Sequence, residues 1–338
     1  MITITIADGT AEKELLNSLR QRSGETDKKV TASVTEILDN VKARGDEAVR
    51  EYTMKFDGRC PEQIEVTRAQ MEAAVANADP RFVQALTNAM ENIREFHSRQ
   101  KQQSFIDAKA NGVIMGQRIR GLKRVGLYVP GGTAAYPSSV LMNAVPAKIA
   151  GVEEVIMVTP PLKDGTANPD ILVAAALAGV DRIFLMGGAQ AVAALAYGTE
   201  SIPKVDKIVG PGNIYVATAK RILYGVVDID MIAGPSEILV MADSTANPKF
   251  LAADLMSQAE HDVLASSILL TTDKAVAEAT VKELERQMAL LSRNEIIEQS
   301  LTGYGAIIVC RTVDEMVNLA NELAPEHLEV MMENPLAY

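Results

Sequence analysis

Two short segments near the end of the chain pair a histidine with groups that can bind a metal ion or move protons. The first is SQAEH, in which Gln258 and His261 lie three residues apart, so a helix would carry both side chains on one face. Zinc accepts histidine nitrogen and oxygen donors, but it usually takes four ligands, and glutamine is an uncommon one. Spacing alone therefore favours an exposed helix face over a metal site.

The second segment is APEH, where Glu326 and His327 are adjacent. Histidine titrates near neutral pH, and a glutamate whose pKa is raised by partial burial can activate water, so the pair could supply general acid and base groups. A single Glu-His dipeptide is a weak signal for a catalytic site. Its position just before an expected strand is what makes it a candidate. Spacing favours a turn serine for Ser236, in AGPSEI, and a solvated helix-end histidine for His97.

Three glycine-rich turns follow strand-like runs in the middle of the chain: YVPGGT beginning at Tyr128, MGGAQ ending at Gln190, and GPGN ending at Asn213. Open α/β sheets bind ligands at the carboxyl ends of their strands, and helix N-termini favour anions. None of the turns matches GxGxxG, so the standard dinucleotide fingerprint is absent. The three polar side chains leave ligand binding and plain turn geometry as equal alternatives.

The order of elements predicts an α/β protein built on parallel sheets. After residue 110, short β-branched runs alternate with Ala-rich helical segments, which is typical of βαβ units. Residues 1–110 are mostly helical in pattern, with a capping-box motif at Ser33–Glu36 and breaks near Gly45 and at Asp79-Pro80. Strands are expected in two series, 125–130, 153–160, 182–188 and 206–212, then 237–243, 266–273, 305–310 and 328–332.

We expect two incomplete Rossmann-like domains, each with a parallel sheet and helices, and an N-terminal helical segment. Residues 1–20 would form an N-terminal arm, and residues 125–240 an α/β domain that carries the glycine-rich turns. Residues 21–124 and 241–338 would together form a discontinuous α/β domain that carries the metal-binding and acid–base candidates.

Composition excludes several classes of protein. The 338 residues carry a net charge of −11, which argues against a nucleic-acid partner because such a partner requires a basic surface. Cys60 and Cys310 cannot make a disulfide framework, so we expect reduced thiols in a cytoplasmic protein. The N-terminus lacks a signal-peptide pattern, and no apolar run approaches the roughly 20 residues that span a bilayer, so no membrane partner is expected.

Six motifs, taken in order, resemble the histidinol dehydrogenase family: LYVPGG, GGAQA, VDKIVGPGN, AGPSE, SQAEH and APEHLE. The stretch LDNVKARGDEAVREYTMKFDG is also similar, so the resemblance runs from about residue 30 to the last residues. It implies a homodimer of subunits with two incomplete Rossmann-type domains. It also implies NAD-dependent oxidation of L-histidinol to L-histidine through the aldehyde, the last steps of histidine biosynthesis, with a zinc ion that positions the substrate.

The resemblance also implies roles for individual residues. The NAD-contacting positions are Tyr128, Gln190 and Asn213. Gln258 and His261 would be zinc ligands, and the substrate-binding positions would be Ser236, Gln258, His261 and His327. In the catalytic pair, His327 would accept a proton and Glu326 would activate the water that attacks the aldehyde.

The sequence departs from the family pattern at its end, where it stops at NPLAY. Family members continue with a helical C-terminal domain that carries an Asp and a His for zinc and a Glu for substrate, and after His327 only Glu329 and Glu333 offer oxygen ligands here. We therefore expect this helical domain to be absent, zinc to bind poorly, and activity to be little or none. A related NAD-dependent dehydrogenase of another small alcohol, or a non-catalytic binding or assembly module, remains open.

Overall fold

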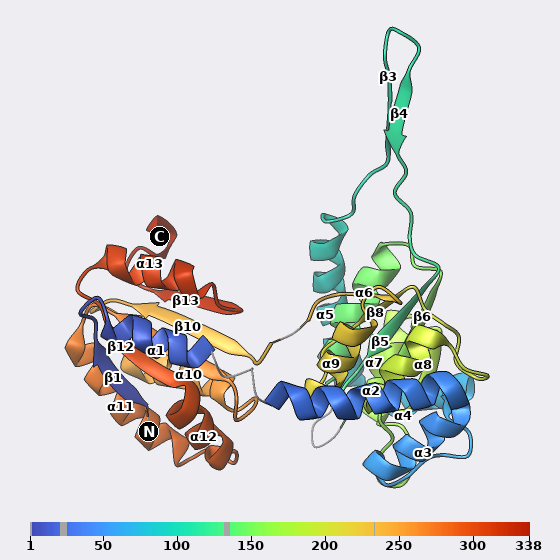
Figure 1. Cartoon of the computed structure of the whole chain (residues 1–338), viewed down its shortest axis with the longest axis horizontal. Coiled ribbons are helices and arrows are strands. Elements are labelled where there is room, and N and C mark those ends of the chain that lie inside the picture. The colour runs from blue at the N-terminus through green and yellow to red at the C-terminus, as the bar shows by residue number, and fades with distance from the viewer. Residues whose placement is uncertain (1, 21–25, 132–135, 233) are drawn as a thin grey trace. The chain divides into compact units, whose positions relative to one another are not determined.

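The computed structural model describes residues 2–20, 26–131, 136–232 and 234–338 (Figure 1). The chain forms two compact units, each with its own sheet. We call Asp27–Ala233 the central unit, and Met1–Thr26 with Gly234–Tyr338 the terminal unit. Each unit is described by itself below.

The described residues of the central unit form a six-stranded sheet in the order β2-β7-β6-β5-β8-β9. All neighbours pair in parallel except β2, which runs antiparallel to β7. The strands are β2 (Glu65–Val66), β5 (Arg124–Tyr128), β6 (Glu154–Thr159), β7 (Arg182–Leu185), β8 (Lys207–Val209) and β9 (Asp228–Ile229).

Helices cover both faces of this sheet, which is why the interiors of its longer strands are apolar. On β6, Ile156 and Val158 face one core while Val155 and Met157 face the other. The first core is completed by α2 (Thr26–Arg44), α3 (Asp46–Asp57), α8 (Gly188–Tyr197) and α9 (Ile214–Leu223). The second is completed by α4 (Arg68–Asn77), α5 (Pro80–Ser98), α6 (Pro137–Ile149) and α7 (Pro169–Ala178).

In the terminal unit the described chain forms a five-stranded, wholly parallel sheet in the order β1-β12-β11-β10-β13. Its strands are β1 (Thr3–Ile6), β10 (Glu237–Ala242), β11 (Ser266–Thr271), β12 (Gly305–Val309) and β13 (His327–Met331). One face packs against α10 (Pro248–Ala259), α11 (Lys274–Met288) and α12 (Asn294–Tyr304). The other packs against α1 (Ala11–Arg20) and α13 (Val313–Leu323), and the 3₁₀ helix η2 (Pro335–Ala337) follows β13.

The α/β class and the eight expected strands are confirmed. The N-terminal helices α2–α5, however, belong to the central unit and not to the terminal unit as expected. Residues 27–124 belong with the strands that follow them, and not with residues 241–338 as expected. The physical reason is direct contact: the carboxylate of Glu65 on β2 forms a two-pronged ion pair with Arg182 on β7, and Asp46 donates its backbone N–H to Glu200. The apolar faces of α2–α5 complete the two cores of the central unit.

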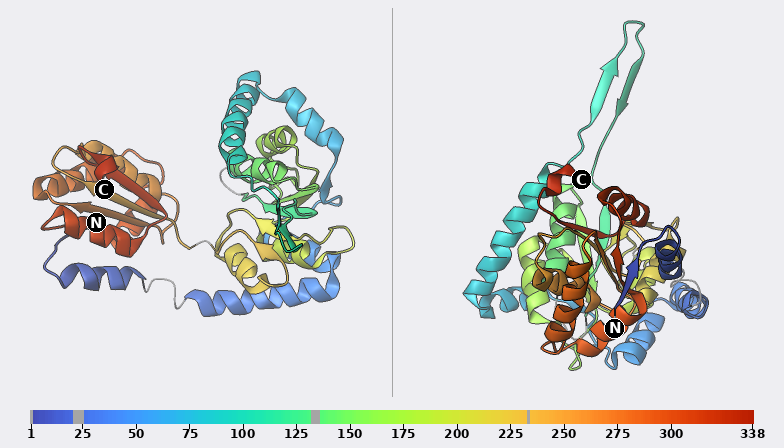
Figure 2. Two further views of the ribbon diagram at one scale, coloured as in Figure 1. Left: turned by 90° about the horizontal axis from the view of Figure 1, so that it is seen from above. Right: turned by 90° about the vertical axis from the view of Figure 1, so that its left-hand side faces the viewer.

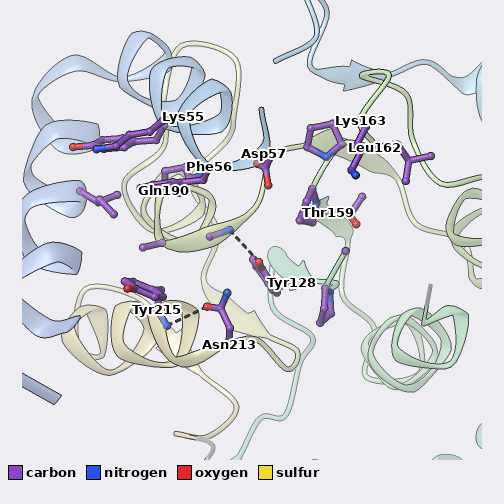
Figure 3. A pocket seen from close by; sticks show the side chains of 18 of the residues that line it. Lys55, Phe56, Asp57, Tyr128, Thr159, Leu162, Lys163, Gln190, Asn213 and Tyr215 are labelled. Carbon is purple, nitrogen blue, oxygen red and sulfur yellow. Dashed lines mark hydrogen bonds between the residues drawn. The ribbon is translucent and has the colours of Figure 1, made fainter. Parts of the chain in front are cut away.

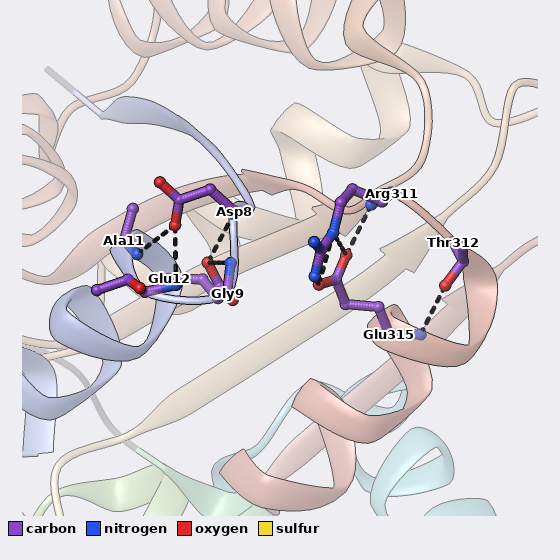
Figure 4. Close-up of polar contacts among 8 residues, drawn as sticks. Asp8, Gly9, Ala11, Glu12, Arg311, Thr312 and Glu315 are labelled. Carbon is purple, nitrogen blue, oxygen red and sulfur yellow. Dashed lines mark hydrogen bonds and ion pairs between the residues drawn. The ribbon is translucent and has the colours of Figure 1, made fainter.

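The first residues are part of the terminal sheet and not a separate arm. Strand β1 pairs in parallel with β12, and Leu16 of α1 is buried in the core. Asp8 accepts hydrogen bonds of 2.8 Å from the backbone N–H groups of Thr10 and Ala11, while the buried Glu12 carboxylate accepts from Asp8 and Gly9 (Figure 4). These bonds fix the turn from strand to helix at the edge of the sheet.

The N-terminal segment also differs from expectation in local detail. The breaks at Gly45 and before Pro80 are confirmed, but the capping box at Ser33–Glu36 is wrong, because α2 already begins at Thr26. A capping box occurs instead at Thr67, paired with Gln70, at the start of α4. Part of the chain expected to be helical forms an exposed hairpin of β3 (Phe105–Ala108) and β4 (Ile114–Gln117), which projects from the central unit in the right-hand view of Figure 2. No helix in the described ranges is long and apolar enough to cross a membrane.

Substitution of Phe184 tests the packing between β7 and α8, the helix that carries Gln190. This β7 side chain is fully buried in the core shared with α8, so Phe184→Ala is expected to lower the free energy of unfolding by roughly 3–5 kcal/mol through lost burial and a cavity. Urea denaturation followed by circular dichroism measures the change. Phe96→Ala on α5 is the matched control, because Phe96 is 62% exposed and its loss should cost less than about 0.5 kcal/mol. Equal losses for the two variants would contradict the packing described.

Candidate functional site

The three glycine-rich turns meet at one edge of the central sheet. Tyr128 ends β5, Gln190 lies in the first turn of α8 after β7, and Asn213 caps α9 after β8. Because these strands are parallel, their carboxyl ends share an edge, and the three residues line one cleft of about 950 Å³ (Figure 3). Residues of α2 and α3 form the rest of its wall together with the segment after β6.

Asn213 holds the start of α9. Its side-chain oxygen accepts from the backbone N–H groups of Tyr215 at 3.0 Å and Val216 at 3.2 Å, which is the usual role of an N-cap asparagine. Its carbonyl oxygen is therefore engaged in the cap, and its amide N–H groups are the side to offer a ligand. The N-terminus of α9 adds the positive end of a helix dipole beside the cleft.

An ion pair between a buried lysine and a partly exposed aspartate fixes the turn that leads to Asn213. Lys220, 3% exposed, forms an ion pair with Asp230 and donates to the carbonyl oxygen of Gly210 at 3.0 Å. Asp230 in turn accepts from the N–H of Gly210 at 2.8 Å. Gly210 has a φ of +112°, and a Cβ there would lie 2.2 Å from the carbonyl oxygen of Tyr128, so only glycine fits between these groups.

Tyr128 is buried with its phenol directed to the turn before α8. Its hydroxyl oxygen accepts a 3.0 Å hydrogen bond from the N–H of Gly188 (Figure 3). Burial raises the pKa of Tyr128 to about 12, so the phenol stays protonated at neutral pH and keeps its O–H as a donor.

Gln190 is the most unusual polar group of the cleft. The side chain is fully buried, yet neither its amide nitrogen nor its amide oxygen has a hydrogen-bond partner among the described residues. Leaving a buried amide unpaired costs roughly 1–3 kcal/mol per group, so such a group in a cleft points to a ligand that pairs with it.

Asp57, the last residue of α3, has the same property and was not found from the sequence. Its Oδ2 atom is shielded from solvent without a partner in the described chain, and burial raises the pKa of the carboxyl to about 6. No local motif marks it, because FDG is an ordinary helix end followed by a C-cap glycine, Gly58. Only the packing of α3 against the sheet brings it to the cleft.

The other candidates lie together at the amino edge of the terminal sheet. Ser236 precedes β10, and Glu326 precedes β13, in whose register His327 pairs with Ile238. Helix α10 runs back across the sheet, so its end near Gln258 lies where β11 begins. The backbone carbonyl of Ser236 accepts from the N–H of Ser266 at 2.9 Å, which ties the starts of β10 and β11 together.

Glu326 and His327 form an accessible pair. The Glu326 carboxylate accepts from the backbone N–H of Glu237 at 3.4 Å, and its other oxygen lies 3.8 Å from Nε2 of His327. Both side chains are more than half exposed, so an ion pair between them contributes little to stability. Their availability to small molecules is the property that matters for acid–base chemistry.

Gln258 and His261 do not share a helix. Helix α10 ends at Ala259, and His261 follows in a turn whose N–H donates to the carbonyl oxygen of Gln258 at 3.1 Å. The expected exposed helix face is therefore wrong: Gln258 is on the helix but only 7% exposed, and His261 is exposed but lies beyond the helix end. The described residues contain no group of three or more His, Cys, Asp or Glu side chains that could hold a metal ion, so the donors present do not fit a complete zinc site.

Two carboxyl groups, those of Asp254 and Glu329, lie close to the Glu326–His327 pair. Asp254 on α10 and Glu329 on β13 lie next to each other, and desolvation raises the pKa of each carboxyl. Glu329 also has a shielded Oε2 without a partner in the described chain, and it shares the strand face of His327 because it lies two residues further on. Sequence spacing did not reveal this pair.

The remaining sequence candidates are structurally plain. His97 is partly exposed at the end of α5, with Nδ1 2.6 Å from Oε1 of Gln100. Cys60 and Cys310 are free thiols, and burial raises the pKa of both, that of Cys310 to about 12. Neither cysteine therefore has the lowered pKa of a reactive thiolate.

Asp57 should impose a pH dependence on stability. Its pKa in the folded chain is about 6, against 3.8 for the ordinary carboxyl, so the folded state binds the proton more tightly. Its contribution to stability is present below about pH 4 and is lost as pH rises through about 6. Asp57→Asn should therefore match the parent chain at pH 4 and become the more stable of the two at pH 7–8. Urea midpoints measured across this range test it, and parallel curves for the two proteins would refute it.

Lys220 should be far more important for folding than a similar surface pair. Lys220→Met removes the charge-assisted contacts of a buried ammonium with Asp230 and with the carbonyl of Gly210, so we expect a loss of roughly 1.5–3 kcal/mol in the free energy of unfolding. Lys207→Met breaks a pair with Asp228 whose side chains are 31% and 53% exposed, and should cost about 1 kcal/mol or less. Thermal and urea unfolding of both variants measure the two losses. Similar losses would contradict the role given to Lys220 in fixing the turn at Gly210.

Comparison with known proteins gives one consistent result. The family model for histidinol dehydrogenase matches residues 20–338. The histidinol dehydrogenase of Clostridium acetobutylicum is 57% identical over 334 residues, which is 98% of this chain and 78% of that protein. That of Listeria monocytogenes is 56% identical over 334 residues, with the same coverage. The crystal structure of histidinol dehydrogenase from Elizabethkingia anophelis matches all of this chain and 77% of that one, with a TM-score of 0.92 and 39% identity. The chain therefore belongs to the histidinol dehydrogenase family.

Proposed function

We propose that this chain catalyses the NAD-dependent oxidation of L-histidinol to L-histidine in the cytoplasm, as a homodimer. The observation that carries the proposal is the buried amide of Gln190, which has no partner among the described residues and for which the sequence resemblance implies a cofactor contact. Oxidation of another small alcohol remains the alternative, because the groups of this chain that recognise the substrate are few.

The cleft of the central unit is proposed to hold NAD. Gln190 offers both a donor and an acceptor, Asn213 offers N–H donors, and the protonated phenol of Tyr128 offers one more donor. Exposed lysines at the wall of the cleft, Lys55 and Lys163, supply positive charge for a pyrophosphate. When bound, NAD accepts a hydride.

The amino edge of the terminal sheet is proposed to move the protons. His327 accepts the proton of the substrate hydroxyl in the first oxidation, giving the aldehyde. Glu326 then takes a proton from water as the water adds to the aldehyde carbon, and the hydrate undergoes the second oxidation. The balance is one alcohol, one water and two NAD giving one carboxylate, two NADH and three protons. Ser236 is proposed as a further substrate contact.

Zinc is proposed to contact Gln258 and His261, and the described residues contain no group of three or more His, Cys, Asp or Glu side chains that could complete its ligand set. Because zinc usually takes four ligands, we expect weak retention and slow turnover. Zinc content after dialysis should fall well below one ion per chain. Stoichiometric zinc and rapid turnover without added metal would contradict the incomplete donor set, but not the proposed reaction.

Single-turnover measurements with the chain in excess over substrate test the reaction even when turnover is slow. With added zinc, each L-histidinol should yield two NADH and one histidine. His327→Asn should slow the first NADH by roughly 10²–10⁴-fold, the usual contribution of general base catalysis, while NAD binding is unchanged. His97→Asn is the matched control and should keep the parent rate. NADH from other amino alcohols but not from histidinol would establish the alternative, and NAD binding with no NADH from any alcohol would indicate a non-catalytic module.

A further inference from the structure

We propose that Asp57 determines cofactor choice: its carboxylate accepts hydrogen bonds from the two neighbouring hydroxyls of a ribose and so selects NAD over its 2′-phosphorylated form. The inference rests on the proposed use of the cleft by a nicotinamide dinucleotide. It assigns a specificity-determining role to a residue that lies outside the six ordered motifs and has no role implied by the resemblance.

The position of Asp57 carries the proposal. It is the last residue of α3, and the following Gly58, with a φ of +72°, ends the helix by donating its N–H to the carbonyl of Met54. The side chain is thereby held on the wall of the cleft. Figure 3 shows it facing the space between Tyr128 and Thr159.

The hydrogen-bonding state of Asp57 defines what it can bind. An ionised carboxylate only accepts hydrogen bonds, and Oδ2 is shielded from water with no donor among the described residues. A ligand that fits must therefore bring donors. Two adjacent hydroxyls on a ribose supply two O–H donors at a spacing that one carboxylate can accept, as acidic residues do in other dinucleotide sites.

The other polar groups of the cleft have different capacities. Tyr128 is a phenol donor, Asn213 presents N–H groups, and Gln190 presents both kinds of group. Glu36 also lines the cleft, but it lies on the exposed part of α2. Asp57 is therefore the shielded acidic group of the described cleft wall.

Charge gives the direction of selectivity. A 2′-phosphate removes one hydroxyl donor and adds up to two negative charges next to a carboxylate that is ionised at pH 7.5 and poorly solvated. Lys55 and Lys163 also line the cleft, but both are exposed, so solvent screens their charge and they offset this added repulsion only in part. Lys55 lies 5.4 Å from the ring centroid of Phe56 and 5.9 Å from that of Tyr52.

Calorimetric titrations of the whole chain with NAD and NADP at pH 7.5 test the proposal, with the parent chain, Asp57→Asn and Asp39→Asn. Asp39 is exposed on α2 and gives the same change in net charge without lining the cleft. We expect Asp57→Asn to weaken NAD binding by roughly ten- to a hundredfold, the usual worth of hydrogen bonds to a charged group. NADP binding should weaken less or improve, so that the NAD preference falls at least tenfold. Asp39→Asn should keep the parent preference.

The possible failures separate the two proposals. If the parent chain binds no NAD, the proposed function fails. If it binds NAD and forms two NADH per histidinol, but Asp57→Asn keeps the parent preference, only the role of Asp57 fails. Deamino-NAD, which lacks the adenine amine, is the third ligand. A variant that loses discrimination against deamino-NAD and keeps it against NADP would place Asp57 at the base and overturn the ribose assignment. Thermal unfolding of both variants confirms that the affinities are those of folded protein.

Discussion

Helices cover both faces of each sheet, so only the ends of the strands can present polar groups to a ligand. This constraint organises the whole protein. In the central unit, alternate residues of each strand enter two different apolar cores, and the strand interiors carry no chemistry. Functional groups are therefore confined to the turns and helix ends at the sheet edges, where backbone hydrogen bonding is also incomplete.

The two units use opposite edges. In the central unit, the candidates lie at the carboxyl edge, beside the N-termini of α8 and α9, where backbone N–H groups and helix dipoles favour a phosphorylated ligand. In the terminal unit, polar groups at the carboxyl edge of the sheet are paired with one another. Glu12 accepts from the turn after β1, and Arg311 pairs with Glu315 after β12 (Figure 4). The candidate acid and base instead lie at the amino edge, where side chains are accessible.

The sequence predicted the strands well, because an apolar run bounded by glycine or proline has few other interpretations. It also predicted the meeting of Tyr128, Gln190 and Asn213, because parallel strands place their carboxyl ends together. It did not predict which sheet the N-terminal helices cover, because the apolar face of an amphipathic helix does not specify which apolar surface it packs against. For the same reason it missed Asp57, which reaches the cleft only through the packing of α3. It named Glu329 as an oxygen donor but not its neighbour Asp254, which is distant in sequence.

The unpaired polar groups of the cleft indicate which hydrogen-bonding groups a ligand must carry. Gln190 needs a donor and an acceptor, Asp57 needs donors, and Tyr128 offers a donor. An inert apolar molecule would satisfy none of these, and a simple anion would satisfy only the donors. A dinucleotide carries an amide, hydroxyls and phosphates in one extended molecule, so it can pair with every one of them. The unpaired groups lower the stability of the empty cleft, and binding restores it, because a ligand that binds only the folded state stabilises that state. Affinity and local instability thus have the same physical origin here.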